Sequence, residues 1–389
     1  MTKYQIITIG SDHPLKEDVI HSVNKRATEL GLNADVVQVI NRSNFDKEYK
    51  ANAPAFCLYF GSEKSVFEDL DLLTRLLRDA TLILPIATNL ALFRDQIPKQ
   101  LENINGTELQ AIEEVEKITA SVLEGLGLLR LSRRLFISYK RDEASTVAIQ
   151  LFESLEKNGF DVFLDTHSIR PGEPFQDELW HRMADTDVVV LLNTPGFLKS
   201  NWTTQELAKA NSMSIGILQL IWPSHTLERD AELSIPLYLK ETDFGNKIFS
   251  EAKSYLTDQA IKAIVNQVES LRARSLASRQ DNIITEFIAS SAKVGIKADL
   301  QAEKFISVIS HDGKEKIVIP TVGVPQAFTY NQSEELVARI KSKKVTEAFL
   351  LYDHRNIRER WLNHLSWLDN YLPIKTVKIV DAETWLRKV

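Results

Sequence analysis

Short apolar runs alternate with amphipathic segments along most of the chain, and the alternation recurs in three blocks. Such alternation is typical of α/β units with parallel sheets. The first block contains strand-like runs at 4–10, 34–40, 55–61 and 81–87. Apolar residues at helical spacing predict helices over 14–31 and 65–79. A further helix over 113–127 ends at a glycine, which predicts a domain boundary there.

The second block predicts a five-stranded sheet. Its expected strands are 135–138, 160–165, 187–193, 215–222 and 234–239. The run DVVVLLN at 187–193 is almost wholly apolar, which indicates a strand covered on both faces. Helices are expected over 144–158 and along the stripe of Phe175, Leu179 and Met183. Strands and helices in this order fit a flavodoxin-like sandwich.

The third block is expected to be a mixed α/β domain. Runs at 303–310 and 315–325 flank an HDGK turn and predict a β-hairpin. A helix is expected over 333–343. Further strands are expected at 347–353 and 374–380, separated by a helix with Ile357, Trp361, Leu365 and Leu368 on one stripe.

The length of the chain supports a division into several domains, because 389 residues exceed one ordinary domain. We expect an N-terminal α/β domain at 1–130, a flavodoxin-like domain at 131–275 and a C-terminal mixed α/β domain at 276–389. The segment after 240 is mainly helical in pattern and would close the middle domain. With 44% hydrophobic and 26% charged residues, each domain can bury a core.

Charge and cysteine content restrict the function classes. A net charge of -6 argues against broad attraction to nucleic acid or to anionic membranes, so we predict no direct nucleic-acid binding and no membrane partner. The single cysteine, Cys57, excludes a disulfide framework and a thiolate metal site, and fits a reducing cytoplasm. No run approaches the roughly 20 apolar residues of a membrane span, and the N-terminus is not a signal peptide. A cytoplasmic protein is therefore expected.

Motifs for metal or nucleotide-phosphate chemistry are missing from the sequence. There is no H-E-x-x-H, no cysteine pair and no G-x-x-x-x-G-K-[ST], so neither a zinc site nor a Walker ATPase is predicted. A polar cluster, YDHRNIRER at 352–360, follows an expected strand. It offers Asp353, His354, Arg355 and Arg358 to an anionic ligand. The alternative is helix capping by Asp353 with solvated arginines.

Three motifs of the second block carry a resemblance to a known family. LFISYKRDEA, GFDVFLDTHSIRPGEPF and ADTDVVVLLNTPGFLKSNWTTQEL, with the spacing between them, resemble a Toll/interleukin-1 receptor (TIR) domain over roughly residues 132–255. The match includes the FISY box of the first strand, the aspartate and Pro-Gly of the mobile BB loop, and the S-x-W-x-x-x-E-L box. Members with the W-x-x-x-E glutamate often cleave the bond between nicotinamide and ribose in NAD, whereas signalling adaptors commonly lack it. Glu206 matches that glutamate.

The four-residue spacing of Trp202 and Glu206 fits a shared ligand-binding cleft. On a helix, residues i and i+4 share one face about 5 to 6 Å apart at Cβ, so both can line one cleft. Cleavage of a glycosidic C–N bond develops positive charge on the ribose, which a carboxylate can stabilise. Glu206 is the candidate catalytic residue, and Trp202 would shape the pocket. The alternative is a core tryptophan and a solvated glutamate.

Other candidate ligand-binding residues lie at the end of the first strand of this block. Phe136, Ser138, Tyr139 and Lys140 fall where open α/β sheets bind ligands, at the carboxyl ends of strands. Phe136 also fits a core position by periodicity, and Lys140 also fits a solvated lysine.

The loop DTHSIRPGEPF is expected to form a mobile flap over the cleft, with Pro171 and Gly172 as its turn. Active members often carry an acidic residue before this turn, where the chain has Arg170. Arg170 could contact a phosphate of the ligand or be a surface arginine. His167 and His181 have no partner at a recognisable spacing and are not assigned a role.

The resemblance predicts an NAD glycohydrolase that produces nicotinamide and ADP-ribose from NAD without a metal. Two alternatives stay open. The same active site could act as a cyclase that makes a cyclic ADP-ribose signal, or the domain could be a noncatalytic scaffold in which Glu206 is incidental.

The flanking domains are expected to regulate this activity, because a free NAD hydrolase would exhaust the cofactor of a cell. The N-terminal domain would be a sensor or assembly domain, and the C-terminal domain would be regulatory or ligand-sensing, with an activating ligand or protein bound to one of them. Resembling bacterial members serve in anti-phage defence, which is the expected context. Self-association through TIR domains predicts a homo-oligomer.

Overall fold

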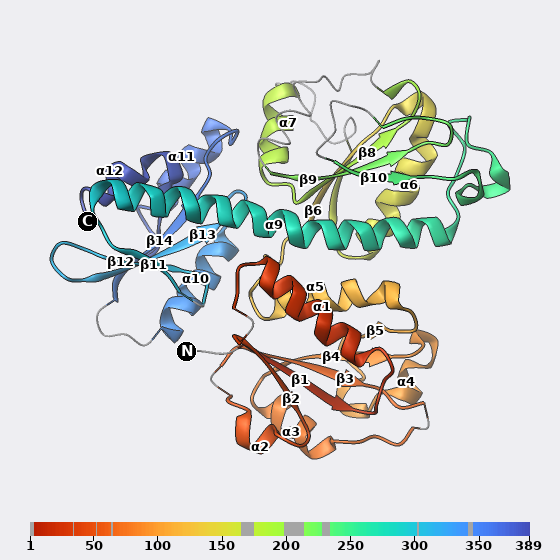
Figure 1. The fold of residues 1–389 in the computed structure, drawn as a ribbon, viewed down its shortest axis with the longest axis horizontal. Helices are drawn as coiled ribbons and strands as arrows, with labels where there is room; N and C mark the ends of the chain where they lie inside the picture. The colour runs from red at the N-terminus through yellow and green to blue at the C-terminus, as the bar shows by residue number, and fades with distance from the viewer. Residues whose placement is uncertain are drawn as a thin grey trace. The chain divides into compact units, whose positions relative to one another are not determined.

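The structure is a computed structural model in which the chain forms two compact units, Met1–Leu131 and Ser132–Val389 (Figure 1). It describes residues 4–33, 35–51, 53–63, 65–164, 175–197, 214–227, 234–301, 303–340 and 345–389. Three five-stranded sheets are present in this part of the chain, one in the first unit and two in the second. The expected α/β class is therefore confirmed.

The first unit is built on a parallel sheet of order β2-β1-β3-β4-β5. Its strands are β1 (Tyr4–Gly10), β2 (Val37–Asn41), β3 (Ala55–Phe60), β4 (Leu82–Ala87) and β5 (Thr107–Glu108). Four of them were expected from the sequence. This strand order is the flavodoxin-like one.

Helices cover both faces of this first sheet. They are α1 (Lys16–Glu29), α2 (Phe45–Glu48), α3 (Leu70–Arg78), α4 (Phe93–Gln96) and α5 (Val115–Gly125). Apolar side chains of α2 and α3 pack on one face, against Ile7 and Ile9 of β1. Helix α5 packs on β3 and α1. Arg26 of α1 is buried and pairs with Glu116 of α5 at 2.9 Å, which holds these two helices together.

The second sheet repeats the same strand order. Its strands are β6 (Arg134–Ser138), β7 (Asp161–Leu164), β8 (Val188–Asn193), β9 (Gly216–Ile221) and β10 (Ile235–Tyr238). They are all parallel and lie in the order β10-β9-β8-β6-β7. Counted along the chain, this is again the flavodoxin-like order, so the five-stranded sheet expected for this block is confirmed.

The two faces of the second sheet have separate cores. Helices α6 (Arg141–Lys157) and α9 (Asp258–Val294) cover one face. Helix α7 (Phe175–Ala184) covers the other, which we call the α7 face. The core cluster of the α7 face consists of Phe136, Phe163, Met183, Val189, Leu191, Phe197, Ile215 and Ile217. Burial on both faces explains why β8 is apolar along nearly its whole length.

The third sheet is mixed. Its strands are β11 (Ala298–Leu300), β12 (Ile306–Ile309), β13 (Glu315–Thr321), β14 (Val345–Tyr352) and β15 (Lys375–Lys378), in sequence order. Strands β12 and β13 pair antiparallel, which confirms the expected hairpin, and β13 to β15 are parallel. Helices α10 (Ala327–Arg339) and α11 (Glu359–Leu368) pack on one face, and α12 (Ala382–Leu386) and α9 pack on the other.

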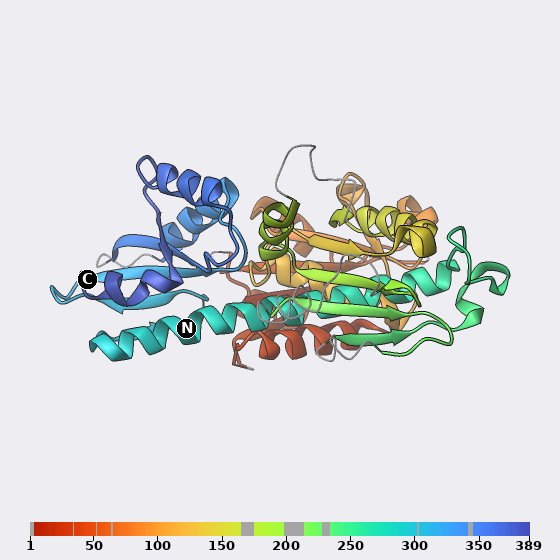
Figure 2. The same ribbon diagram turned by 90° about the horizontal axis from the view of Figure 1, so that it is seen from above.

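One helix, α9, serves both sheets of the second unit. It has 37 residues and is therefore about 55 Å long. Its first half packs on β8, β9 and α6, and its second half packs on β11, β13 and α12 (Figures 1 and 2). Thr257 caps its start through the amide of Ala260, and Gly295 ends it with a φ of 74°, where glycine is favoured. The expected domain boundary at 275 falls inside this helix, and the three-domain division stays a prediction.

A buried ion pair fixes the middle of α9 to the second sheet. Nε of Arg272 donates to Oδ2 of Asp187 at 2.8 Å, and both side chains are almost completely inaccessible. Ser275, one turn later, donates to the carbonyl of Asp187. The same Asp187 carboxylate accepts from the backbone amide of Arg134, so the pair also fixes the start of β6.

Helix α7 provides a second link between the two sheets. Ala184, at its end, packs in the core of the third sheet with Tyr330 and Leu350. Glu178 of α7 accepts from Arg358 at 2.6 Å. Asp185, the next residue after α7, accepts from the backbone amide of Val324. The second unit is therefore joined at two places, along α9 and at the end of α7.

We expect Arg272→Met to lower the free energy of unfolding by about 3–5 kcal/mol, because Asp187 would keep a buried charge without its cation. Chemical denaturation of the parent and the variant measures this difference.

Arg355→Ala is the matched control, because Arg355 pairs with Asp353 at 2.8 Å while being 60% exposed. An exposed pair contributes at most about 1 kcal/mol. Equal losses in the two variants would show that the buried pair does not anchor α9.

Candidate active site

The carboxyl ends of β6 and β8 form the natural ligand edge of the second sheet. The chain passes from β6 to β7 on one side and then crosses to β8 on the other. Ligands of open α/β sheets bind at such a switch point, outside the carboxyl ends of the strands. Strand β6 ends at Ser138 and β8 ends at Asn193. The side chains near these two residues therefore lie at the expected ligand edge.

Two buried polar side chains near this edge lie in one row across the sheet. Ser138 of β6 pairs in register with Leu191 of β8, which in turn pairs with Gln219 of β9. Neighbours in register point to the same face of a sheet, and Leu191 belongs to the cluster of the α7 face. Ser138 and Gln219 thus flank Leu191 on that face, roughly 10 Å apart at two strand spacings.

Both side chains of this row carry a polar atom that has no partner among the described residues. Ser138 and Gln219 are 0% exposed. The hydroxyl of Ser138 and the amide nitrogen of Gln219 have no hydrogen-bond partner in the part of the chain that the structure describes. Buried polar groups of this kind are uncommon and costly. They are therefore candidate contacts for a polar ligand on the α7 face.

Asn193 fastens the loop that follows β9 to the same edge. Its side chain is buried, and its amide nitrogen donates to the carbonyl of Thr226 at 3.1 Å. Its amide oxygen lies 3.1 Å from Nε2 of His225. These bonds hold the end of β8 to the loop that follows β9.

A charged bridge connects the start of α6 to the end of β8. Lys140 pairs with Glu143, and Glu143 also accepts from the backbone amide of Gly196 at 2.9 Å. Burial opposes ionisation of Glu143, but the hydrogen bonds from its neighbours, led by Lys140, hold the pKa of this carboxyl below its usual value. Lys140 is thus held at the ligand edge as one half of an ion pair.

The other two candidates from this stretch, Phe136 in β6 and Tyr139 just after it, pack on opposite faces of the second sheet. Phe136 is in the core of the α7 face, 1% exposed, and stacks on Phe163 at 5.3 Å. Tyr139 is also buried, and it packs in the core on the face covered by α6 and α9. Of the four expected neighbours of the ligand, Ser138 and Lys140 present polar groups at the edge, and the two aromatic rings pack in cores.

The remaining predicted site residues, Trp202, Glu206, Arg170 and Gly172, lie outside the described residues. Described residues on both sides of the segment that contains Trp202 and Glu206 pack on the α7 face of the sheet. Phe197, after β8, and Ile215, before β9, both pack in the cluster of the α7 face. Phe197 and Ile215 therefore lie on the same face of the sheet as Ser138 and Gln219.

Three residues of this edge, Glu143, Asn193 and Gln219, were not identified from the sequence. Asn193 and Gln219 had a detectable signal, because a polar residue within or at the end of an otherwise apolar strand needs a partner for its side chain. Glu143 had no such signal, since its contact with Gly196 joins two segments that are far apart along the chain.

The polar cluster at 352–360 is largely engaged within the protein. Arg355 forms a hydrogen bond through its backbone amide and an ion pair through its side chain, both with Asp353. Arg358 pairs with Glu178 of α7. The expected capping by Asp353 is wrong, because Asp353 accepts from the amide of Arg355 in the loop, whereas α11 begins after Arg358 without a side-chain cap. The expected solvation of Arg358 is also wrong, because this side chain is 22% exposed and pairs with Glu178 of α7.

The described residues contain no group of three or more His, Cys, Asp or Glu side chains able to hold a metal ion. No helix among them is long and apolar enough to cross a membrane.

Comparison with known proteins agrees with the motifs on which the resemblance rests. Residues 135–238 match the TIR domain family. Over 72 residues, 18% of this chain, the sequence is 28% identical to the 2′ cyclic ADP-D-ribose synthase BtTIR of Bacteroides thetaiotaomicron, and the alignment covers 25% of that protein. Over 118 residues, 28% of this chain, it is 29% identical to the probable 2′ cyclic ADP-D-ribose synthase BdTIR of Brachypodium distachyon, and covers 53% of it.

The alignments span a quarter and about half of the length of these two relatives. The family match extends from the second residue of β6 to the last residue of β10. It therefore covers nearly the whole of the second sheet, whose strand order and switch point are described above. Residues 135–238 of this chain form a TIR domain.

Proposed function

We propose that the TIR domain cleaves the bond between nicotinamide and ribose in NAD, with Glu206 as the catalytic carboxylate. The observation that carries this proposal is the TIR match over 135–238, a range that includes Glu206. Two relatives of this chain are named as 2′ cyclic ADP-D-ribose synthases, one of them as a probable one, which also supports it. The row of Ser138 and Gln219 supports it, because these buried polar side chains lie on the face where described residues on both sides of the segment containing Glu206 pack.

Each group would have a separate task in this reaction. As the C–N bond breaks, the electron pair leaves with nicotinamide and positive charge develops on the ribose, where the Glu206 carboxylate would stabilise it. Trp202 would provide a flat wall, and Arg170 and Gly172 would lie on the flap. Ser138 and Lys140 would contact polar groups of the dinucleotide, while Phe136 and Tyr139 would support the edge from within the cores.

Hydrolysis and cyclisation differ only in the group that attacks the ribose. Attack by water gives ADP-ribose and a proton, and attack by a nucleophile of the same molecule gives a cyclic product. Cyclisation is the second candidate, because both relatives described above are named as 2′ cyclic ADP-D-ribose synthases. The role in anti-phage defence, the homo-oligomer and control by the flanking domains remain predictions from the family resemblance.

We expect Glu206→Ala to release nicotinamide from NAD at least about 100-fold more slowly than the parent, because removal of one preorganised electrostatic group costs about that much. Chromatography of the reaction mixture measures nicotinamide, ADP-ribose and cyclic ADP-ribose together, so it also separates hydrolysis from cyclisation.

Glu153→Ala is the matched control, because Glu153 is an exposed glutamate on α6, which covers the opposite face of the sheet. Its rate should equal that of the parent. Equal rates for Glu206→Ala and the parent would refute the assignment of the carboxylate, and a scaffold function would then be favoured.

We expect Ser138→Ala to raise the KM for NAD by about 2- to 10-fold, because the variant loses one hydrogen bond to NAD, which contributes about 0.5–1.5 kcal/mol. Its free energy of unfolding should stay the same or rise by about 1 kcal/mol, because the substitution removes a buried hydroxyl that has no partner among the described residues. Initial rates and chemical denaturation measure the two quantities.

Thr119→Val is a suitable control for Ser138→Ala, because the Thr119 hydroxyl is also buried without a partner in the described part of the chain but lies on α5 of the first unit. This variant should share the gain in stability and leave KM unchanged. A stabilised Ser138→Ala with an unaltered KM would show that Ser138 does not contact NAD.

A further inference from the structure

A row of aromatic side chains follows the solvent side of α11 and continues just beyond the end of this helix. The α11 ring row consists of Trp361, His364, Trp367 and Tyr371, whose spacing of three or four residues places them along one side of a helix. All four are exposed, Trp361 to 42%, Trp367 to 53% and Tyr371 to 71%. Among the described tryptophans, only the two of this row are exposed. Exposed apolar side chains that gather in one patch mark an interaction surface, whereas single ones are ordinary.

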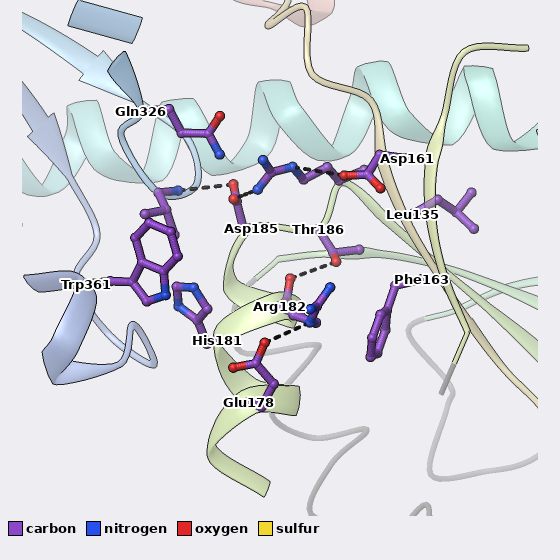
Figure 3. A pocket seen from close by; sticks show the side chains of 12 residues that line it. Leu135, Asp161, Phe163, Glu178, His181, Arg182, Asp185, Thr186, Gln326 and Trp361 are labelled. Carbon is purple, nitrogen blue, oxygen red and sulfur yellow. Dashed lines mark hydrogen bonds and ion pairs between the residues drawn. The ribbon is translucent and has the colours of Figure 1, made fainter. Parts of the chain in front are cut away.

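The rings of the α11 ring row are held against one another. At its start, Trp361 stacks on His181 of α7, with ring centroids 5.3 Å apart (Figure 3). Consecutive rings within the row then contact each other, with centroid distances of 6.0, 5.9 and 5.0 Å from Trp361 to Tyr371. Rings that are already ordered lose little conformational entropy when a partner binds. The row is therefore a preorganised binding surface.

The helix contains no Asp, Glu, Lys or Arg along most of the row, because these residue types are missing from 361–368. The next residue, Asp369, is turned to the third sheet, where its carboxylate accepts from the amide and the hydroxyl of Thr376. The phosphates of a nucleic acid and the charges of an ionic peptide therefore have no matching cluster of charges on this surface. An uncharged surface with aromatic rings fits it best, as in the cores of homodimer interfaces, where aromatic residues are enriched and charged ones depleted.

The α11 ring row is self-complementary, because its spacing is nearly the same in both directions. When two copies of α11 lie antiparallel about a two-fold axis near residue 366, Trp361 faces the partner's Tyr371, and His364 faces the partner's Trp367. Every ring of one copy then meets a ring of the other. Arg360, one residue before the row, comes to lie at the partner's Tyr371, whose ring face attracts a cation. A contact of this kind uses the same patch on both subunits and needs no second surface.

We propose that a second copy of this chain docks on the α11 ring row, so that the rows of two copies pack antiparallel around a two-fold axis. The exposed parts of the rings provide roughly 300–400 Å² per copy, because a whole aromatic side chain offers about 150–250 Å². A stable interface buries about 800 Å² per partner. The row alone therefore supports weak, reversible association, which becomes stronger when the same two chains share a second contact.

The proposed contact lies next to the TIR domain. Trp361 packs on His181 of α7, and Arg358, three residues earlier, pairs with Glu178 of the same helix at 2.6 Å. A dimer through α11 therefore brings two TIR domains together without using the surface of the TIR domain for the contact. This association does not depend on cleavage of NAD.

Sedimentation equilibrium of the full chain, run from low to high micromolar concentration, tests the proposal. The average mass is expected to rise with concentration from that of one chain towards that of two. Trp367→Glu puts a carboxylate at the centre of the contact in both copies, so the association constant should fall by about tenfold or more. Phe328→Glu is the matched control, because Phe328 is a 54% exposed ring on α10 that makes no ring contact with the row; its association constant should equal that of the parent.

Two results would overturn the proposal: a chain that stays monomeric over the whole range, or equal association of Trp367→Glu and the parent. The first result would leave the row to a different kind of partner, and the second would assign the association to another surface, such as the TIR domain. Thermal denaturation checks that each variant is folded. Should Trp367→Glu be unfolded, Tyr371→Glu replaces it, because Tyr371 is 71% exposed and lies beyond the end of α11; an unchanged association constant in Tyr371→Glu refutes the contact.

Discussion

The buried pair of Arg272 and Asp187 is the constraint on which the second unit depends. It holds the middle of α9 against the start of β6 and β8, so that a single helix can continue from one sheet to the next. A charge pair in an inaccessible position has little tolerance for displacement, because either partner alone would be a buried charge. The register of α9 on the TIR sheet, and with it the position of the third sheet, follows from this contact.

The opposite edge of the TIR sheet differs from this satisfied ion pair in its hydrogen bonding. Among the described residues, the hydroxyl of Ser138 and the amide nitrogen of Gln219 have no hydrogen-bond partner, and an unsatisfied buried polar atom costs stability. Proteins commonly carry such costs at sites where a ligand completes the hydrogen bonds. The ion pair at one end of the strands therefore has a structural role, whereas the polar atoms at the other end, which lack partners among the described residues, are expected to contact a ligand.

Helix α7 connects these two ends. Its side chains cover the face that carries Ser138 and Gln219, and its last residue packs in the core of the third sheet. Through Glu178 and Arg358 it is also joined to α11 by an ion pair. Because α7 contacts both the second and the third sheet, a displacement at the third sheet can be transmitted through it to the candidate active site, provided that the helix moves as one rigid body.

The sequence by itself determined the α/β class, most of the strands and the TIR domain, because buried parallel strands and the motif residues leave local patterns. It did not reveal β5 or β11, which are too short for any periodicity, nor the early start of α10 at Ala327, where buried Tyr330 packs on the third sheet. Only the tertiary structure paired His181 with Trp361, Glu143 with Gly196 and Arg272 with Asp187. Such contacts join residues far apart along the chain, and their partners are selected by packing rather than by spacing.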